Sequence, residues 1–93
     1  MKEIKFEWDN HKDKSNQKKH GVSFEEAATV FADTLSATIS DPLHSIEEDR
    51  YIIVGRSFKG RTLVVVHTDR GDNIRLISAR LATKNERRKY EEG

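Results

Sequence analysis

Five side chains from distant segments of the sequence have the chemistry needed to act on a phosphodiester: Lys19, His20, Arg61, Arg80 and Glu86. RNA is cleaved without a metal ion when its own 2′-hydroxyl attacks the adjacent phosphorus atom. That reaction needs a group to accept the hydroxyl proton, an acid to protonate the leaving 5′-oxygen, and cations to stabilise the developing charge. His20 suits either proton transfer because imidazole titrates near neutral pH. Glu86 is a second candidate base, and the three cations would stabilise the charge.

Arg75 and Arg80, both in the strand predicted near residues 73–80, also have a structural interpretation. A guanidinium beside apolar residues normally has a carboxylate partner, because burying an unpaired charge is costly. Arg80 can pair with Glu86 and so hold the C-terminal segment in place. Arg75 falls in the same predicted strand, but a straight strand sends Arg75 and Arg80 to opposite faces. Both reach one site only if the strand twists or bulges between them, so Arg80 is the stronger candidate.

The basic segment before Gly21 predicts a polar helix. Asp9 suits the helix N-cap and Gly21 suits its end, which gives a helix over residues 10–20. Four of its polar residues share one face at helical spacing: Lys12, Asn16, Lys19 and His20. This face is either a solvated surface or a patch that contacts phosphate, and the pattern leaves both open.

Capping signals predict two further helices. Ser23 and Glu26 form a capping-box pattern ahead of an apolar stripe, which predicts a core-facing helix over residues 24–33. Thr83 and Glu86 repeat the pattern and predict a C-terminal helix through about Tyr90.

Alternating apolar residues predict the strands. Ile4, Phe6 and Trp8 give a short first strand, and period-two patterns predict strands near 36–40, 50–57, 62–69 and 73–80. An acidic loop containing Pro42 joins the first two of these four strands, and short turns join the others. The short loops predict an antiparallel meander. We therefore expect an α+β fold whose helices cover one face of the sheet.

Composition bounds the class of protein. The chain has 93 residues, which we interpret as one domain over residues 1–93. Its hydrophobic fraction of 34% is below its charged fraction of 35%, a lean core that favours completion by a partner. There is no cysteine, which excludes disulfides and thiolate metal sites. With no apolar signal region and no apolar run of membrane length, we expect a cytoplasmic protein.

The sequence gives no pattern for a metal or a nucleotide cofactor. The four histidines, His11, His20, His44 and His67, are scattered without helical spacing. No glycine-rich loop joins a strand to a helix. His67 alternates with Val65 and Leu63 in a predicted strand, which favours a structural role. We expect no metal and no cofactor.

Several motifs together resemble the BrnT family of toxins. The residues that carry the resemblance are Phe6-Glu7-Trp8-Asp9, Lys12, Asn16, Lys19-His20-Gly21-Val22-Ser23-Phe24-Glu25-Glu26-Ala27, Val30-Phe31, Gly55, Gly60-Arg61, Ile77-Ser78-Ala79-Arg80, Ala82-Thr83, Glu86-Arg87 and Tyr90. They span nearly the whole chain in order.

The resemblance implies a RelE-like α+β fold and a metal-independent endoribonuclease that inhibits translation and arrests growth. It implies a BrnA-like antitoxin with a ribbon-helix-helix domain, in a hetero-oligomer that binds its own promoter DNA through the antitoxin. By position, the candidate catalytic residues are His20, Arg61, Arg80 and Glu86. The candidate RNA-binding residues are Lys12, Asn16, Lys19, Arg75 and Tyr90.

Two other functions use the same basic surface. A non-catalytic RNA- or ribosome-binding module would bind RNA in a salt-dependent way and leave it intact. A pure partner subunit would instead pair these cations with an acidic segment of an antitoxin.

Overall fold

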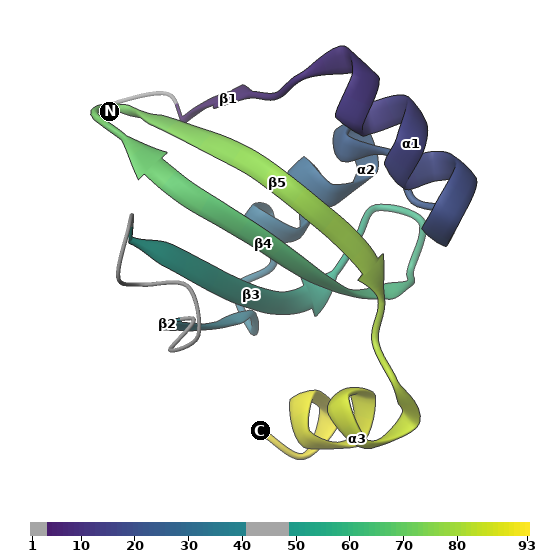
Figure 1. Ribbon diagram of the computed structural model, residues 1–93. Coiled ribbons are helices and arrows are strands. Elements are labelled where there is room, and N and C mark those ends of the chain that lie inside the picture. Colours follow the sequence, from purple (N-terminus) through teal and green to yellow (C-terminus); the bar gives the residue numbers. More distant parts are fainter. Residues whose placement is uncertain (1–3, 41–48) are drawn as a thin grey trace.

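The computed structural model describes residues 4–40 and 49–93, which form a five-stranded sheet with helices packed on it (Figure 1). The strands are β1 (Lys5–Glu7), β2 (Ala37–Ser40), β3 (Arg50–Arg56), β4 (Thr62–Arg70) and β5 (Asn73–Leu81). Their order in the sheet is β1-β5-β4-β3-β2. The antiparallel meander of β2 to β5 is confirmed, and β1 adds to it in parallel beside β5. The predicted acidic loop around Pro42 lies outside the described residues.

The first helix begins and ends at the predicted residues. In α1 (Asn10–His20), the Asp9 carboxylate accepts the backbone N–H of His11 at 2.7 Å and so caps the helix. Gly21 ends it with a φ of 69°, a left-handed conformation that glycine adopts without steric cost.

The second helix is shorter than predicted and is capped differently. α2 (Phe24–Thr29) gives way to a 3₁₀ turn, η1 (Val30–Ala32), so the α-helix does not reach residue 33. Ser23 accepts the backbone N–H of Glu26 at 3.0 Å, which is the hydroxyl half of the capping box. The carboxylate half is not formed. The Glu26 side chain instead turns away to meet an arginine, because a charge-assisted bond is stronger than one to a neutral N–H.

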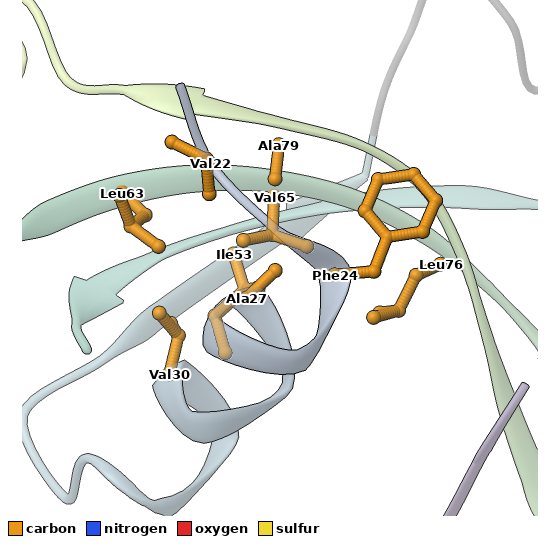
Figure 2. Close-up of a cluster of buried hydrophobic side chains, with 9 residues drawn as sticks. All are labelled: Val22, Phe24, Ala27, Val30, Ile53, Leu63, Val65, Leu76 and Ala79. Atoms are coloured by element: carbon orange, nitrogen blue, oxygen red, sulfur yellow. The ribbon is translucent and has the colours of Figure 1, made fainter. Parts of the chain in front are cut away.

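The core lies between the sheet and the first two helices. We call this side of the sheet the covered face. Figure 2 shows its buried side chains, which come from the α1–α2 connection, α2, η1 and the central strands: Val22, Phe24, Ala27, Val30, Ile53, Leu63, Val65, Leu76 and Ala79. Side chains alternate along each strand, so Val54, Val64 and Arg80 lie on the other side, the open face.

A bulge in β5 changes which residues share a face. The register with β4 shifts between Val66 and His67, so Val66 pairs with Ser78 whereas His67 pairs with Leu76. Ile77 is the extra residue, and it reverses the alternation on either side of it. The strand thus bulges between the two arginines, which is the condition for them to share a face, and Arg75 and Arg80 both lie on the open face.

The C-terminal helix does not cover the same face as the first two. α3 (Lys84–Glu92) begins with the predicted capping box, in which Thr83 and Glu86 bond each other's backbone N–H groups. It lies beyond the end of β5 (Figure 1). Arg80, on the open face, joins it to the sheet by hydrogen bonds to Glu86. The expectation that all helices cover one face thus holds for α1 and α2 only. None of the described helices combines the length and apolar character that crossing a membrane requires.

Candidate functional site

A cleft between the β3–β4 turn and α3 gathers three guanidinium groups. It encloses about 540 Å³. Its lining residues are Arg56, Gly60, Arg61, Thr62, Leu81, Ala82, Arg87 and Glu91. We call it the arginine cleft. A single carboxylate among these groups leaves the lining net positive, which suits an anionic ligand.

The turn between β3 and β4 sets the position of Arg61. The Ser57 N–H donates to the Arg61 carbonyl at 2.8 Å, and the Gly60 N–H donates to the Ser57 carbonyl at 2.9 Å. Gly60 has a φ of 78°, a conformation that other residues rarely adopt. The Phe58 N–H donates to the Thr29 hydroxyl at 3.0 Å and so fastens the turn to α2.

A buried carboxylate beneath this turn fixes the Arg61 side chain. Glu26 is 1% exposed and accepts hydrogen bonds from the Ser57 hydroxyl at 2.6 Å and from Arg61 Nε at 2.9 Å. Arg61 Nη2 donates to the second carboxylate oxygen. The Arg61 guanidinium lowers the pKa of Glu26, so the carboxyl is ionised at neutral pH. No hydrogen bond of Arg61 Nη1 is found within residues 4–40 and 49–93.

Arg61 also connects the cleft to the end of α1. Its Nη2 donates to the Gly21 carbonyl at 3.1 Å, next to His20 in sequence. Lys19 and His20 are exposed in the last turn of α1, and Lys12 is exposed in its first. The structure thus joins Arg61 to the basic end of α1, although His20 does not line the cleft itself.

Arg80 and Glu86 form an ion pair with two hydrogen bonds, as their structural interpretation predicts. Arg80 Nη1 and Nη2 donate to the Glu86 carboxylate at 2.7 Å and 2.9 Å. The guanidinium lowers the pKa of Glu86 to about 2. A carboxylate with that pKa is a weak proton acceptor, so the geometry does not favour Glu86 as general base.

This pair lines a second hollow that is separate from the arginine cleft. The open-face groove encloses about 510 Å³. Its lining is Leu35, Ser36, Ala37, Ile39, Ile52, Val54, Val64, Arg80, Glu86, Lys89, Tyr90 and Gly93. The predicted catalytic residues therefore divide between two hollows, with Arg61 in one and Arg80 and Glu86 in the other.

Tyr90 lines the open-face groove and connects α3 to the end of β3. Its hydroxyl donates to the Asp33 carboxylate, which also accepts the Arg56 N–H at 2.8 Å. The bond to Asp33 raises the pKa of Tyr90, so the phenol keeps its proton at neutral pH. The Arg56 guanidinium lies 5.9 Å from the centre of the Tyr90 ring, a cation–π contact that helps to orient it.

Asn16 and Arg75 are placed away from both hollows. Asn16 is buried beneath α1, where its amide donates to the carbonyls of Val22 at 2.8 Å and Ala79 at 2.7 Å. It also accepts the Ala79 N–H at 3.1 Å, so its amide serves the fold and is not presented to RNA. Arg75 pairs with Thr68 on β4, whereas Arg80 pairs with Val64, four residues away on the same strand. At the rise of an extended strand, these two positions on β4 are about 13 Å apart.

His67 is buried in the core, in keeping with the structural role that its alternation favours. Its ring lies 5.8 Å from that of Tyr51 and 4.8 Å from that of Phe31. Burial lowers the pKa of His67, so the imidazole is neutral near pH 7. No group of three or more histidine, aspartate or glutamate side chains in the described part of the chain could hold a metal ion.

Apart from Arg61, none of the residues that line the arginine cleft was among the candidate catalytic or RNA-binding residues, although Arg87 belongs to the motifs that carry the family resemblance. Glu26 was explained by its capping pattern, which gave no reason to look for a partner 35 residues away. The signal for Arg87 and Glu91 is their four-residue spacing on α3, which places both side chains on one helix face.

Comparisons with known proteins support one family. Residues 8–86 match the sequence profile described as "Ribonuclease toxin, BrnT, of type II toxin-antitoxin system". The structure is similar to the crystal structure of the Brucella abortus ribonuclease toxin, BrnT, with a TM-score of 0.66 and 22% sequence identity. That likeness covers 88% of this chain and 100% of the other, and it shows a shared fold. No match was found among curated proteins.

Proposed function

The chain belongs to the BrnT family of ribonuclease toxins of type II toxin–antitoxin systems, and from this premise we propose that it is an endoribonuclease that cleaves RNA without a metal ion. In the proposed reaction the 2′-hydroxyl of the RNA gives up its proton to a base and attacks the adjacent phosphorus. A 2′,3′-cyclic phosphate forms while the bond to the leaving 5′-oxygen breaks, and that oxygen takes up a proton from an acid.

The observation that carries the proposal is the orientation of Arg61 toward the arginine cleft. A guanidinium presents planar donors that match the oxygens of a phosphate. Glu26 and Gly21 hold Nε and Nη2 of Arg61, which leaves Nη1 for the substrate. A donor already in position stabilises the charge on the phosphorus oxygens without reorganising during the reaction.

We assign proton transfer to His20. Of the four proposed catalytic residues, it is the one imidazole, a side chain that can both accept and donate a proton. Glu86 is held by Arg80 at a pKa of about 2, so its proposed role is to position α3 beside the substrate. Lys12 and Lys19 are exposed on α1 and would contact RNA phosphates on the approach to the cleft.

The finer biological proposals follow from the family. We propose a single RelE-like domain in the cytoplasm that inhibits translation and arrests growth. Its partner would be a BrnA-like ribbon-helix-helix antitoxin, in a complex that binds promoter DNA through the antitoxin. The lean hydrophobic composition of 34% supports completion of the chain by such a partner.

Product analysis with a defined RNA tests the proposed chemistry. We expect fragments with 2′,3′-cyclic phosphate and 5′-hydroxyl ends, formed equally well with and without EDTA. His20→Ala should lower the rate about a hundredfold, because general acid–base catalysis contributes on that order. His11→Ala, also on α1, is the matched control and should cleave normally. Loss of cleavage in EDTA would refute the metal-independent mechanism.

One observation favours the non-catalytic alternative. The one predicted proton-transfer group other than His20 is occupied, since the Glu86 carboxylate accepts hydrogen bonds from Arg80. A binding module would retain intact RNA at low salt and release it steeply as salt rises. RNA that stays intact under those conditions, with translating ribosomes also present, would decide for this alternative.

A further inference from the structure

Two arginines of the cleft meet at one carboxylate oxygen. Glu91 Oε1 lies 3.9 Å from Arg56 Nη2 and 4.0 Å from Arg87 Nε. These separations exceed hydrogen-bond length, and the three side chains are 50–54% exposed. Exposed ion pairs of this kind contribute little free energy because water screens them. The carboxylate is therefore readily replaced by a stronger anion.

We propose that Arg56 and Arg87 form a second phosphate subsite for RNA, beside Arg61, and that Glu91 occupies it as an internal competitor when no RNA is bound. This inference rests on the proposed function in taking RNA as the ligand. A phosphodiester offers several acceptor oxygens, so it can form charge-assisted hydrogen bonds to both guanidiniums. Glu91 offers charge without such bonds.

Arg56 has contacts outside the subsite. Its backbone N–H is held by Asp33, and its guanidinium lies over the ring of Tyr90. Arg87 projects from α3, the helix that the Arg80–Glu86 pair joins to β5. The two cations therefore come from different elements that line the cleft, and the contact of Arg56 with Tyr90 does not depend on Glu91.

The ordinary explanation is that Arg87 and Glu91 are an exposed pair four residues apart on a helix. The two explanations predict different results for removal of the Glu91 charge. A competitor that is removed leaves the subsite open and tightens RNA binding. If Arg87 and Glu91 are only a pair on the helix surface, breaking that pair changes RNA binding no more than removal of any neighbouring acidic charge does.

Binding of a short 2′-O-methyl oligouridylate separates this test from catalysis, because the probe lacks the attacking hydroxyl. Glu91→Gln should tighten binding about threefold, and Glu92→Gln, its neighbour outside the cleft, should change it far less. Arg87→Ala should weaken binding about fivefold and lower the slope of log affinity against log salt by about 0.7. Arg88→Ala is the matched control on the same helix.

The subsite is refuted if the Glu91 and Glu92 variants bind alike, or if the Arg87 and Arg88 variants do. Arg56→Gln tests the other arginine of the subsite and should weaken binding of the probe about as much as Arg87→Ala does. Thermal melting of each variant verifies that it is folded. If the expected binding pattern holds while unmodified RNA stays intact, the subsite stands and the proposed cleavage fails.

Discussion

The molecule contains two arginine–carboxylate pairs of similar geometry in very different surroundings. In each, one guanidinium donates to both oxygens of one carboxylate. The Glu26 side chain of the first pair is 1% exposed, whereas the Glu86 side chain of the second is 34% exposed. The partners are 35 residues apart in the first pair and six apart in the second.

The buried Arg61–Glu26 pair fixes the orientation of a side chain, whereas the exposed Arg80–Glu86 pair, which we call the tether, holds α3 against β5. The Arg61–Glu26 pair joins α2, the β3–β4 turn and the end of α1, so the Arg61 guanidinium has one favourable orientation. The Arg80–Glu86 pair joins α3 to the strand directly before it. A buried carboxylate without its partner would be left desolvated and unpaired, whereas an exposed one regains water. We therefore expect the two pairs to respond differently to the same substitutions.

Glu26→Gln should have the largest effect. Without the buried negative charge, Arg61 loses its counterion, and the free energy of unfolding should fall by about 3 kcal/mol. In a domain of this size that corresponds to a melting temperature lower by roughly 12–24 °C. Denaturant unfolding and thermal melting measure both quantities. The adjacent exposed Glu25→Gln is the control, and equal stability of the two variants would contradict the orienting role.

Arg61→Lys sharpens the comparison by keeping the charge and removing the planar donors. A lysine cannot bond both Glu26 oxygens and the substrate at once, so RNA cleavage should slow about tenfold. Arg80→Lys makes the same change in the Arg80–Glu86 pair and should slow cleavage less than threefold. The loss of rate is smaller because this ion pair is exposed and water screens it. The two rates are compared on one RNA, and an Arg80→Lys loss equal to that of Arg61→Lys would make the pairs equivalent.

Glu86→Gln should cost about 1 kcal/mol at neutral pH, because the pair is partly exposed and screened. The pKa of Glu86 is lowered from its ordinary 4.5 to about 2, so the folded state releases this proton more readily than the unfolded state. Its contribution is complete above pH 4.5 and is lost as pH falls toward 2. The free energy of unfolding of wild type and variant is measured across that pH range, and the difference between them should shrink as pH falls. A difference that stays constant would exclude the ion pair as its source.

Lys59→Ala should have the smallest effect. Its Nζ lies 4.0 Å from Glu26, and its side chain is 55% exposed. At that distance and exposure the free energy of unfolding should change by less than about 0.5 kcal/mol. A larger loss in urea unfolding would mean that Glu26 responds to total charge and not to the guanidinium of Arg61.

The same two pairs show why one part of the site was predictable from sequence and the other was not. Arg80 and Glu86 are close along the chain, and the Thr83 capping signal placed Glu86 at the start of a helix. Glu26 and Arg61 meet only once α2 packs on the sheet, and the capping pattern of Ser23 supplied a sufficient local explanation for Glu26. Long-range pairs leave no spacing signal, because their distance depends on the whole fold.

The fold itself was predicted more fully because its signals are local. The caps Asp9, Gly21 and Thr83 and the apolar alternation of the strands defined the elements. A bulge between Arg75 and Arg80 was raised only as a condition, and the parallel pairing of β1 was not predicted, since both arise from contact between strands. Asn16 was assigned to an RNA-contacting face because a polar helix gives no indication of which side packs inward.

The buried amide of Asn16 also has a consequence for self-association. On the side of β5 away from β4, β1 pairs only with Asn73–Arg75, and the described chain places no other strand on that side. Unpaired backbone groups at such an edge invite another molecule to add a strand. The Asn16 amide donates to the Ala79 carbonyl and accepts the Ala79 N–H, as the peptide group of a neighbouring strand would. One helix residue thereby occupies two of the backbone groups that an added strand would need at this edge.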